Sequence, residues 1–219
     1  MPDLDRLEQL RSCDEPAFRE LYEIYAAAIV ARERKPEKWI CAMVRSPEYG
    51  VWVMKRGGGG GRVTGFSILF LPSGGRFALL EYMAVAADER NRGIGSELFK
   101  QSMRQAIPPE RRSVPVVLEI DSDREAGDDQ QIRTRRQRFY RRLGCVQISG
   151  LHYILPLPGE GAPPEMDLMV YSTPPLRQLS KAELERWLST IYRDVYHCSP
   201  EDPRIARMLR ELPNPVRLA

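Results

Sequence analysis

The chain has 219 residues, of which 42% are hydrophobic, and its formal net charge is +3. The length suits one domain with an appendage, or at most two small domains, and the apolar content excludes global disorder. The small net charge argues against a dedicated nucleic-acid partner. No apolar run approaches the ~20 residues that cross a bilayer, so no membrane partner is expected either.

The four cysteines and two histidines form no metal-ligand pattern. Cys13, Cys41, Cys145 and Cys198 are far apart and make no C-x-x-C pair, so no metal is expected. The first residues are polar and acidic and lack an apolar signal core. We therefore expect a cytoplasmic protein with reduced cysteines.

Helices are the first elements that the sequence predicts clearly, because residues 4–10 fit a strand or a helical lead-in equally well. Apolar side chains at helical spacing predict a helix over residues 16–34 and a shorter one between Pro36 and Pro47. Strands are then expected at 51–54, 63–70 and 77–85. The glycines at 57–61 predict a hairpin turn rather than a phosphate loop, because no Gly-Lys-Ser/Thr follows.

The second half alternates helices and strands. Its expected elements are a helix at 93–106, a strand at 114–120, a helix at 132–143, and strands at 146–155 and 166–171. After residue 173 the pattern is helical, with a capping box at Ser180 and a short helix near 205–209. This order predicts an α/β protein: a mixed sheet flanked by helices at 1–172, with a C-terminal helical extension at 173–219.

The turn between the third strand and its helix is rich in glycine and arginine. It reads Arg90-Asn91-Arg92-Gly93-Ile94-Gly95. Backbone N–H groups at a helix start bind anions with help from the helix dipole, and glycine lets the ligand approach closely. Arg90 and Arg92 add charge-assisted bonds to phosphate oxygens. The turn therefore predicts a pyrophosphate site.

Two blocks of sequence carry a family resemblance. Residues 85–95 resemble the acyl-CoA signature of the GNAT N-acetyltransferase superfamily, V-x-P-x-x-[RQ]-x-x-G-x-[GA], with Ala87 in place of the usual proline. Residues 138–145 resemble the segment F-Y-x-x-x-G-F of that family, with Cys145 at the aromatic position. The element order over 4–172 matches as well, whereas the tail is not covered. The resemblance implies a GNAT acyltransferase fold and acetyl transfer from acetyl-CoA to a primary amine, by direct attack in a ternary complex.

The same resemblance assigns roles to residues. Acyl-CoA would lie between the third strand and the next one, with its pantetheine and acetyl groups held by Met83, Ala84 and Val85. The pyrophosphate would be surrounded by Arg90, Asn91, Arg92, Gly93, Ile94, Gly95 and Ser96. Tyr140 would protonate the departing CoA thiolate. Alternatively, Tyr140 only packs its helix against the sheet.

The attacking amine must be neutral, so a base or a water relay is required. Strand alternation predicts that Glu81 shares one face with Met83 and Val85, and Glu81 is where several family members carry their base. Glu119 and Asp121 on the next strand compete for this role. The structural alternative is that Glu81 pairs with an arginine. We take Glu81 as the base.

The acceptor is not identified by the sequence. It should enter near the first two helices and residues 156–164, where carboxylates would suit a cationic amine: Glu37, Glu48, Glu160, Glu165 and Asp167. The alternatives are protein or peptide N-acetylation, which needs an open groove beside the last strands, and a non-catalytic acyl-CoA-binding module. A tail folded over that groove would favour a small amine.

Two further surfaces are open to interpretation. Arginines crowd the helix at 132–143, at positions 133, 135, 136, 138, 141 and 142. A solvated face balanced by the acidic stretch 121–129 is preferred to a grip on nucleic acid or on the CoA 3′-phosphate. In the tail, Leu184, Trp187 and Ile191 form an apolar stripe. We expect a homodimer if this stripe is exposed and a monomer if it is buried.

Overall fold

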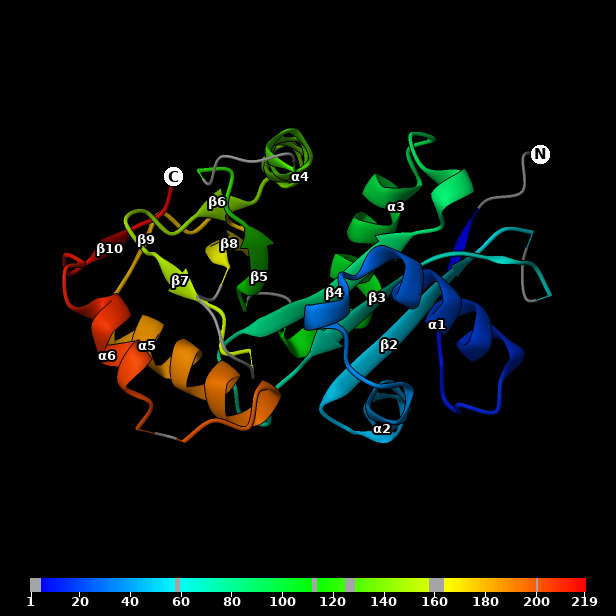
Figure 1. Ribbon diagram of the computed structural model, residues 1–219, viewed down its shortest axis with the longest axis horizontal. Helices are drawn as coiled ribbons and strands as arrows, with labels where there is room; N and C mark the ends of the chain where they lie inside the picture. The colour runs from blue at the N-terminus through cyan, green and yellow to red at the C-terminus, as the bar shows by residue number, and fades with distance from the viewer. Residues whose placement is uncertain (1–4, 58–59, 112–113, 125–128, 158–163, 200) are drawn as a thin grey trace. The chain divides into compact units, whose positions relative to one another are not determined.

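The computed structural model describes residues 5–57, 60–111, 114–124, 129–157, 164–199 and 201–219. The chain divides into two units, Met1–Arg112 and Ser113–Ala219, and each is described by itself (Figure 1). Within the described ranges, no helix combines the length and the apolar character needed to cross a membrane.

The described part of the first unit contains four antiparallel strands that pair in the order β1-β2-β3-β4. Their bounds are Arg6–Gln9, Tyr49–Lys55, Val63–Phe70 and Ala78–Val85. The predicted strands are confirmed, and the undecided segment 4–10 supplies β1. The predicted glycine turn connects β2 to β3, although Gly58 and Gly59 lie outside the described residues.

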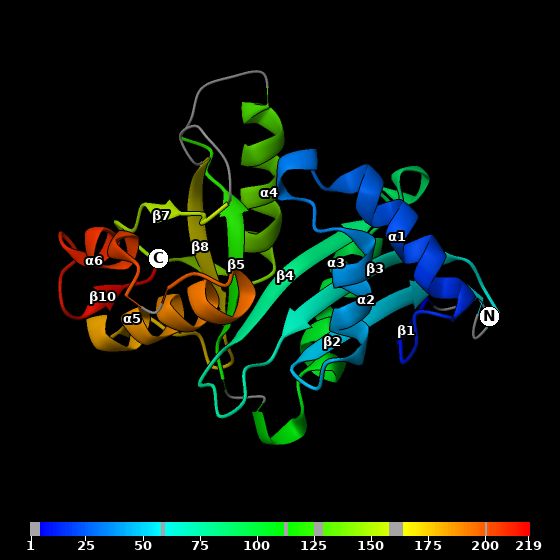
Figure 2. The same ribbon diagram turned by 60° about the horizontal axis from the view of Figure 1, so that its bottom comes forward.

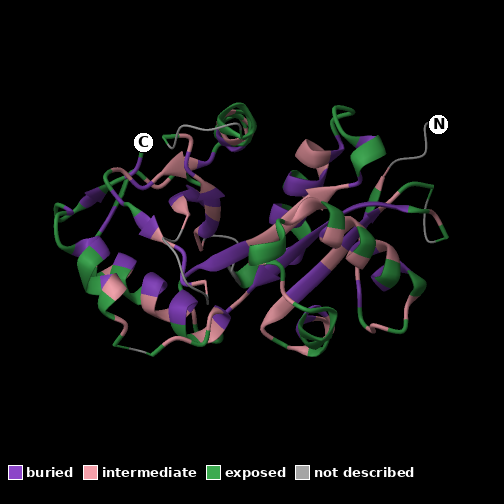
Figure 3. Cartoon of the chain, viewed as in Figure 1, coloured by how far each residue is buried: buried purple, intermediate pink, exposed green. Residues whose placement is uncertain are grey.

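Helices cover both faces of this sheet (Figure 1). On one face, Tyr25 of the first helix packs with Phe66 and Ile68 of β3 in a buried core. On the other face, Ile94 and Leu98 form a second, smaller core. Because both faces are covered, β3 is buried along its whole length (Figure 3). The helices are α1 Pro16–Ala28 and α2 Glu37–Arg45 on the first face, and α3 Ile94–Gln101 on the second.

The first helix is shorter than predicted. It ends at Ala28, and Ile29 and Val30 are extended before a 3₁₀ turn at Ala31–Glu33. Adjacent β-branched residues favour extended backbone, which explains the early end. By contrast, α3 continues as a π-helix over Ser102–Ala106, so its predicted extent is confirmed.

Strand β4 contains a bulge at Glu81. The register pairs Ile68 with Tyr82 but Leu69 with Leu80, so Glu81 has no partner on β3. An extra residue of this kind shifts the alternation of the side chains beyond it.

The bulge corrects the expected distribution of side chains along β4. Met83 and Val85 pack in the core on the α3 face, whereas Tyr82 packs in the core on the α1 face. Glu81 contacts Lys35, which lies between α1 and α2. The prediction that Glu81 shares a face with Met83 and Val85 is therefore wrong, because simple alternation does not hold across a bulge.

In the described part of the second unit, one long strand forms hydrogen bonds with three others. Strand β8 pairs antiparallel with β5, β6 and β7. The bounds are β5 Val116–Asp121, β6 Val146–Gln147, β7 Tyr153–Ile154 and β8 Glu165–Tyr171. The single strand predicted at 146–155 is wrong, because it is interrupted. Between its two pieces, Ile148 pairs with Leu218 of the tail and Gly150 adopts a φ of 76°.

Helix α4 (Gln130–Arg142) covers one face of this second sheet, and the tail helices cover the other face (Figure 2). The tail helices are α5 Lys181–Thr190 and α6 Pro203–Leu209. The predicted cap of α5 is confirmed, because the Ser180 hydroxyl accepts a hydrogen bond from the Glu183 N–H at 3.2 Å. The tail is not wholly helical as expected. It also contains two short paired strands, β9 (Gln178–Leu179) and β10 (Val216–Arg217).

The apolar stripe of the tail lies inside its own unit. Leu184 and Ile191 are 0% exposed and Trp187 is 2% exposed. This stripe is therefore not available as a surface for pairing two copies.

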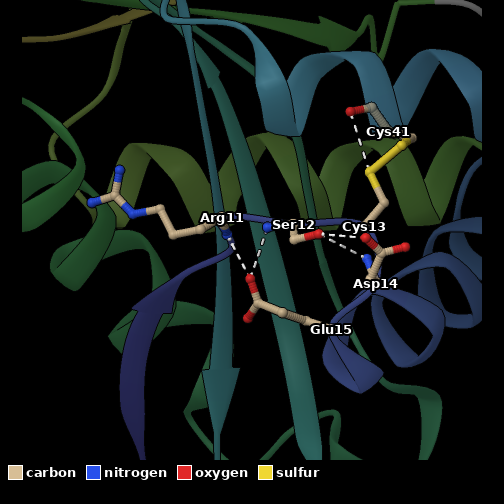
Figure 4. Close-up of a disulfide and its surroundings, with 6 residues drawn as sticks. All are labelled: Arg11, Ser12, Cys13, Asp14, Glu15 and Cys41. Carbon is tan, nitrogen blue, oxygen red and sulfur yellow. Dashed lines mark hydrogen bonds between the residues drawn. A yellow bond between two sulfur atoms is a disulfide. The ribbon is translucent and has the colours of Figure 1, made fainter.

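Cys13 and Cys41 form a disulfide (Figure 4). Cys13 precedes α1 and Cys41 lies within α2, and their Cα atoms are 5.6 Å apart. The expectation that all cysteines are reduced is wrong for this pair. The pairing depends on packing between residues 28 positions apart, and no sequence pattern reports it. Cys145 and Cys198 are free.

Candidate functional site

The turn before α3 forms an open helix start. Gly93 caps α3 with a left-handed φ of 83°, and a Cβ there would meet nothing within 4 Å. Glycine is thus favoured by the backbone conformation, while the space beside it stays open. The N–H groups of Ser96 and Glu97 donate to the Gly93 carbonyl at 3.0 and 3.2 Å. The N–H groups of Ile94 and Gly95 have no acceptor within the helix, as helix geometry dictates, so they suit an anion.

A buried carboxylate anchors this turn. Both Glu89 oxygens accept hydrogen bonds from the Arg56 guanidinium, at 2.8 and 2.7 Å. Arg92 adds a third at 3.1 Å, and the hydrogen bonds from Arg56 hold the pKa of Glu89 below its usual range. Of the two arginines predicted to bind phosphate, Arg92 therefore helps to hold the turn. Arg90 is exposed and makes no contact within the described residues.

The end of β4 and the start of α3 are held together. Met83 and Val85 pack against Ile94 and Leu98, between the sheet and the helix. Gly65 of β3 permits this approach, because a Cβ there would lie 3.2 Å from Leu98 Cδ2 and 2.8 Å from a backbone oxygen of β4. The residues predicted to hold acyl-CoA thus gather within the first unit.

Glu81 is secluded from solvent, with a side chain that is 2% exposed. Its Oε1 accepts a hydrogen bond from Lys35 Nζ at 2.5 Å. Its Oε2 is buried and has no hydrogen-bond partner among the described residues. The alternative to a catalytic role was an ion pair between Glu81 and an arginine. Glu81 does form an ion pair, but with a lysine, and this lysine contacts only one of the two carboxylate oxygens.

Tyr140 lies on α4 in the second unit and is 7% exposed. Burial raises its pKa well above the ordinary value. The same cause raises the pKa of the neighbouring Cys145 thiol to about 12. A phenol that stays protonated at neutral pH meets the first requirement of a proton donor. Its ring also packs edge-on against Phe139 of the same helix, with 5.0 Å between the ring centroids.

A family comparison covers these elements. Residues 47–146 match the family model described as "Acetyltransferase (GNAT) domain". This part of the chain is therefore similar to a GNAT acetyltransferase domain. It contains β4, the turn before α3, and α4, so both blocks of the predicted resemblance lie inside the match.

Solved structures share the fold. A putative GNAT acetyltransferase from Bacteroides thetaiotaomicron gives a TM-score of 0.70 at 18% identity, covering 89% of this chain and 99% of that one. The ribosomal-protein-S18-alanine N-acetyltransferase from Escherichia coli gives 0.53 at 20% identity, covering 77% and 94%. An acetyltransferase from Bacillus subtilis in complex with CoA gives 0.51 at 15% identity, covering 77% and 99%. The predicted GNAT fold is confirmed. Among curated proteins, none matches the sequence.

The two carboxylates that compete with Glu81 lie in the second unit, and each has a partner there. Glu119 accepts a hydrogen bond from Tyr153 at one oxygen and from Tyr196 at the other, the latter at 2.7 Å. Asp121 pairs with Arg136 on α4. Glu119 thus has both oxygens hydrogen-bonded, whereas Asp121 pairs through Oδ2 and differs from Glu81 in being 23% exposed.

Most of the carboxylates expected near the acceptor also have hydrogen-bond or ion-pair partners within the protein. Glu48 accepts the Ser73 N–H at 2.9 Å. Glu165 and Asp167 both pair with Arg124, at 2.6 and 2.8 Å. Glu37 is exposed in the first turn of α2, and Glu160 lies outside the described residues.

Two arginines of α4 contact side chains of neighbouring strands. Besides the pair with Asp121, Arg141 donates to the Gln147 side chain at 2.6 Å. Residues 125–128 of the acidic stretch lie outside the described residues. Within the described ranges, no group of three or more His, Cys, Asp or Glu is placed to hold a metal ion.

Sequence reasoning missed Lys35 and Arg56. Each is a single basic residue without a motif, and each meets its partner across the fold: Lys35 meets Glu81 46 positions away, and Arg56 meets Glu89 33 positions away. The one local signal was Glu89, which lies within the GNAT signature.

Proposed function

We propose that this protein is an N-acetyltransferase that moves an acetyl group from acetyl-CoA to the primary amine of a small molecule. The observation that carries this proposal is the state of Glu81. Its carboxylate is buried with one oxygen unpartnered, in the strand that leads into an anion-binding turn. Buried polar atoms are nearly always hydrogen-bonded, and exceptions concentrate where chemistry uses them.

The helix start at α3 supports acetyl-CoA as the donor. The free N–H groups and the open space beside Gly93 fit a pyrophosphate. The proposed contacts are Met83, Ala84 and Val85 for the pantetheine and acetyl groups, and residues 90–96 for the pyrophosphate. Bound acetyl-CoA supplies a thioester carbonyl that an amine can attack.

The chain's own residues would then manage the protons. Glu81 Oε2 takes the proton that makes the incoming ammonium a neutral amine. The amine nitrogen forms the new C–N bond and releases its second surplus proton to solvent, and the C–S bond breaks with its electron pair on sulfur; Glu81 then returns its proton to solvent. Tyr140 donates its proton to that thiolate and regains one from water. Overall, an ammonium and a thioester give an amide, a thiol and one proton.

The tail supports a small acceptor rather than a polypeptide. Tyr192 donates a hydrogen bond to the Ile154 carbonyl, and Met208 Sδ accepts the Ile154 N–H at 3.2 Å. Tyr196 reaches Glu119 on β5. The tail is thus folded over β7 and over the face of the second sheet opposite α4. A peptide acceptor would need that groove to be open. We propose that 173–219 acts as an extension of the 1–172 domain with this role.

The experiment is a screen for acetyl-CoA-dependent thiol release with spermidine, a set of monoamines and amino acids, and a peptide that begins with alanine. We expect turnover with a small amine and none with the peptide. Glu81→Gln and Tyr140→Phe should lose turnover while CoA affinity, measured by calorimetry, is kept. CoA binding without thiol release on any amine would indicate the binding module instead. A parent protein that does not bind CoA would overturn both readings.

A further inference from the structure

The segment between α1 and α2 is fixed at two backbone positions, one by Tyr25 of α1 and the other by Tyr82 of β4. The Tyr25 hydroxyl accepts the Lys35 N–H at 2.7 Å, and the Tyr82 hydroxyl donates to the Glu33 carbonyl at 3.3 Å. Both phenols are themselves held by aromatic contacts, since the rings of Tyr25 and Tyr82 meet edge-on at 5.0 Å. Tyr25 is completely buried. The backbone of Lys35 is therefore placed by the core and does not depend on its own side chain.

This placement brings the Lys35 ammonium to Glu81 in surroundings that exclude water. The Lys35 side chain is 13% exposed and that of Glu81 is 2% exposed. An ion pair that is shielded from solvent is screened little by salt. Because Nζ occupies Oε1, Oε2 is left as the oxygen that can accept a proton.

We infer that Lys35 is a positioning residue, which keeps Glu81 ionised and presents its Oε2 to the acceptor amine. The inference rests on the proposed function. A buried carboxylate without a nearby cation favours its protonated form, and a protonated carboxyl group cannot accept a proton from an ammonium. The lysine supplies that cation from a rigid support and touches neither substrate nor cofactor.

The other titratable groups near this pair are phenols. Tyr25 and Tyr22 project from α1, and Tyr82 projects from the residue after the bulge. Burial raises the pKa of Tyr25 above its ordinary value. Phenols ordinarily titrate near pH 10 and carry no charge on the acidic side of neutrality.

The test is a kinetic cycle on the amine that the screen identifies, with variants Lys35→Met, Lys35→Arg, Glu81→Gln and the double variant Lys35→Met with Glu81→Gln. Lys35→Met should lower kcat by about tenfold or more while the KM for acetyl-CoA is unchanged, because base catalysis contributes 10²–10⁴-fold. In the Glu81→Gln background the same change should have no further effect. Lys35→Arg, which keeps the cation, should recover most of the rate.

The pH profile separates this role from a structural one. In Lys35→Met the acid limb of kcat should move to higher pH by about one unit, because loss of the cation favours the protonated carboxyl group. Lys55→Met is the matched control. Lys55 is 12% exposed, much like Lys35, and it pairs at 3.0 Å with Glu8, which is 26% exposed, so its loss removes the ion pair of a similarly buried lysine away from Glu81.

Three results would overturn the inference: an acid limb that stays in place in Lys35→Met, equal losses of kcat in Lys35→Met and Lys55→Met, or additive losses in the double variant. The double variant leaves no unpaired buried charge at this position. Comparing its kcat with that of Glu81→Gln therefore tests the coupling even where Lys35→Met alone folds poorly. If the parent protein acetylates no amine, the proposed function itself is wrong. If the parent is active but the acid limb of its kcat–pH profile does not move in Lys35→Met, only the role of Lys35 is wrong.

Discussion

Each unit of this protein holds a glutamate on a strand, and the two are held in different ways. In the first unit, Lys35 occupies one oxygen of Glu81 and leaves the other without a hydrogen bond among the described residues. In the second unit, Tyr153 and Tyr196 each donate to one oxygen of Glu119. The two glutamates therefore differ in their hydrogen bonding rather than in their position on a strand: Glu119 joins the tail to the sheet, and Glu81 keeps the free oxygen that the proposed function requires.

The largest expected effect tests this contrast directly. Glu81→Gln should lower kcat by roughly 10²–10⁴-fold, because the proton acceptor is lost while shape is kept. Glu119→Gln should change kcat by less than about threefold, since both of its oxygens serve the fold. Steady-state kinetics with acetyl-CoA and the accepted amine measure both. Equal losses in the two variants would break the comparison.

The disulfide between Cys13 and Cys41 lies in the first unit, so its reduction should affect the two units differently. The segment closed by Cys13 and Cys41 includes Lys35, so reduction should loosen the first unit and leave the contacts of Glu119 intact. Reduction should destabilise the protein by about 2–4 kcal/mol, the range typical of native disulfides. Urea unfolding with and without reductant measures this, and the Cys13→Ser/Cys41→Ser variant should not respond to reductant. In denaturant without reductant, two of the four cysteines should be alkylated. Alkylation of all four would contradict the pairing.

A smaller effect is expected from the tail. Tyr196→Phe removes the donor to one oxygen of Glu119 and should lower the free energy of unfolding by about 1 kcal/mol. Turnover should stay near that of the parent. Urea denaturation and kinetics on the same preparation test both points, with Glu119→Gln/Tyr196→Phe as the partner variant for a double-mutant cycle. A loss of turnover like that of Glu81→Gln would give Glu119 a catalytic part.

The smallest effect concerns pH. Hydrogen bonds from Arg56 lower the pKa of Glu89 in the folded state, so the unfolded chain takes up the proton first as the pH falls. The stability from this pair is therefore complete above the ordinary glutamate pKa and is lost as the pH falls through the lowered value. Arg56→Met should reduce the melting temperature more at pH 7 than at pH 3. Arg62→Met, which breaks the exposed pair with Asp88, is the control and should have less effect at pH 7. A pH-independent difference would show that Arg56 acts by packing alone.

The sequence predicts well those features that lie within a few residues of one another. The turn from Arg90 to Gly95 and the cap at Ser180 are local, and the order of strands and helices follows from periodicity. The features that define the base are not local. The pairing of Lys35 with Glu81 spans 46 positions, and the bulge that turns Glu81 toward Lys35 depends on its register with β3. Short strands such as β9 and β10 have too few residues for any periodicity, so they are missed too.

The bulge at Glu81 lets β4 fill the two hydrophobic cores and also carry a carboxylate. In a regular strand, a carboxylate would take the place of a core side chain. The residues before and after the bulge keep both hydrophobic cores filled, while the extra residue is left over for chemistry. An engineer who wished to install a proton acceptor in another antiparallel sheet could insert one residue rather than replace one. Conversely, deleting residue 81 here would give a regular strand and, on the proposed function, a protein without its proton acceptor.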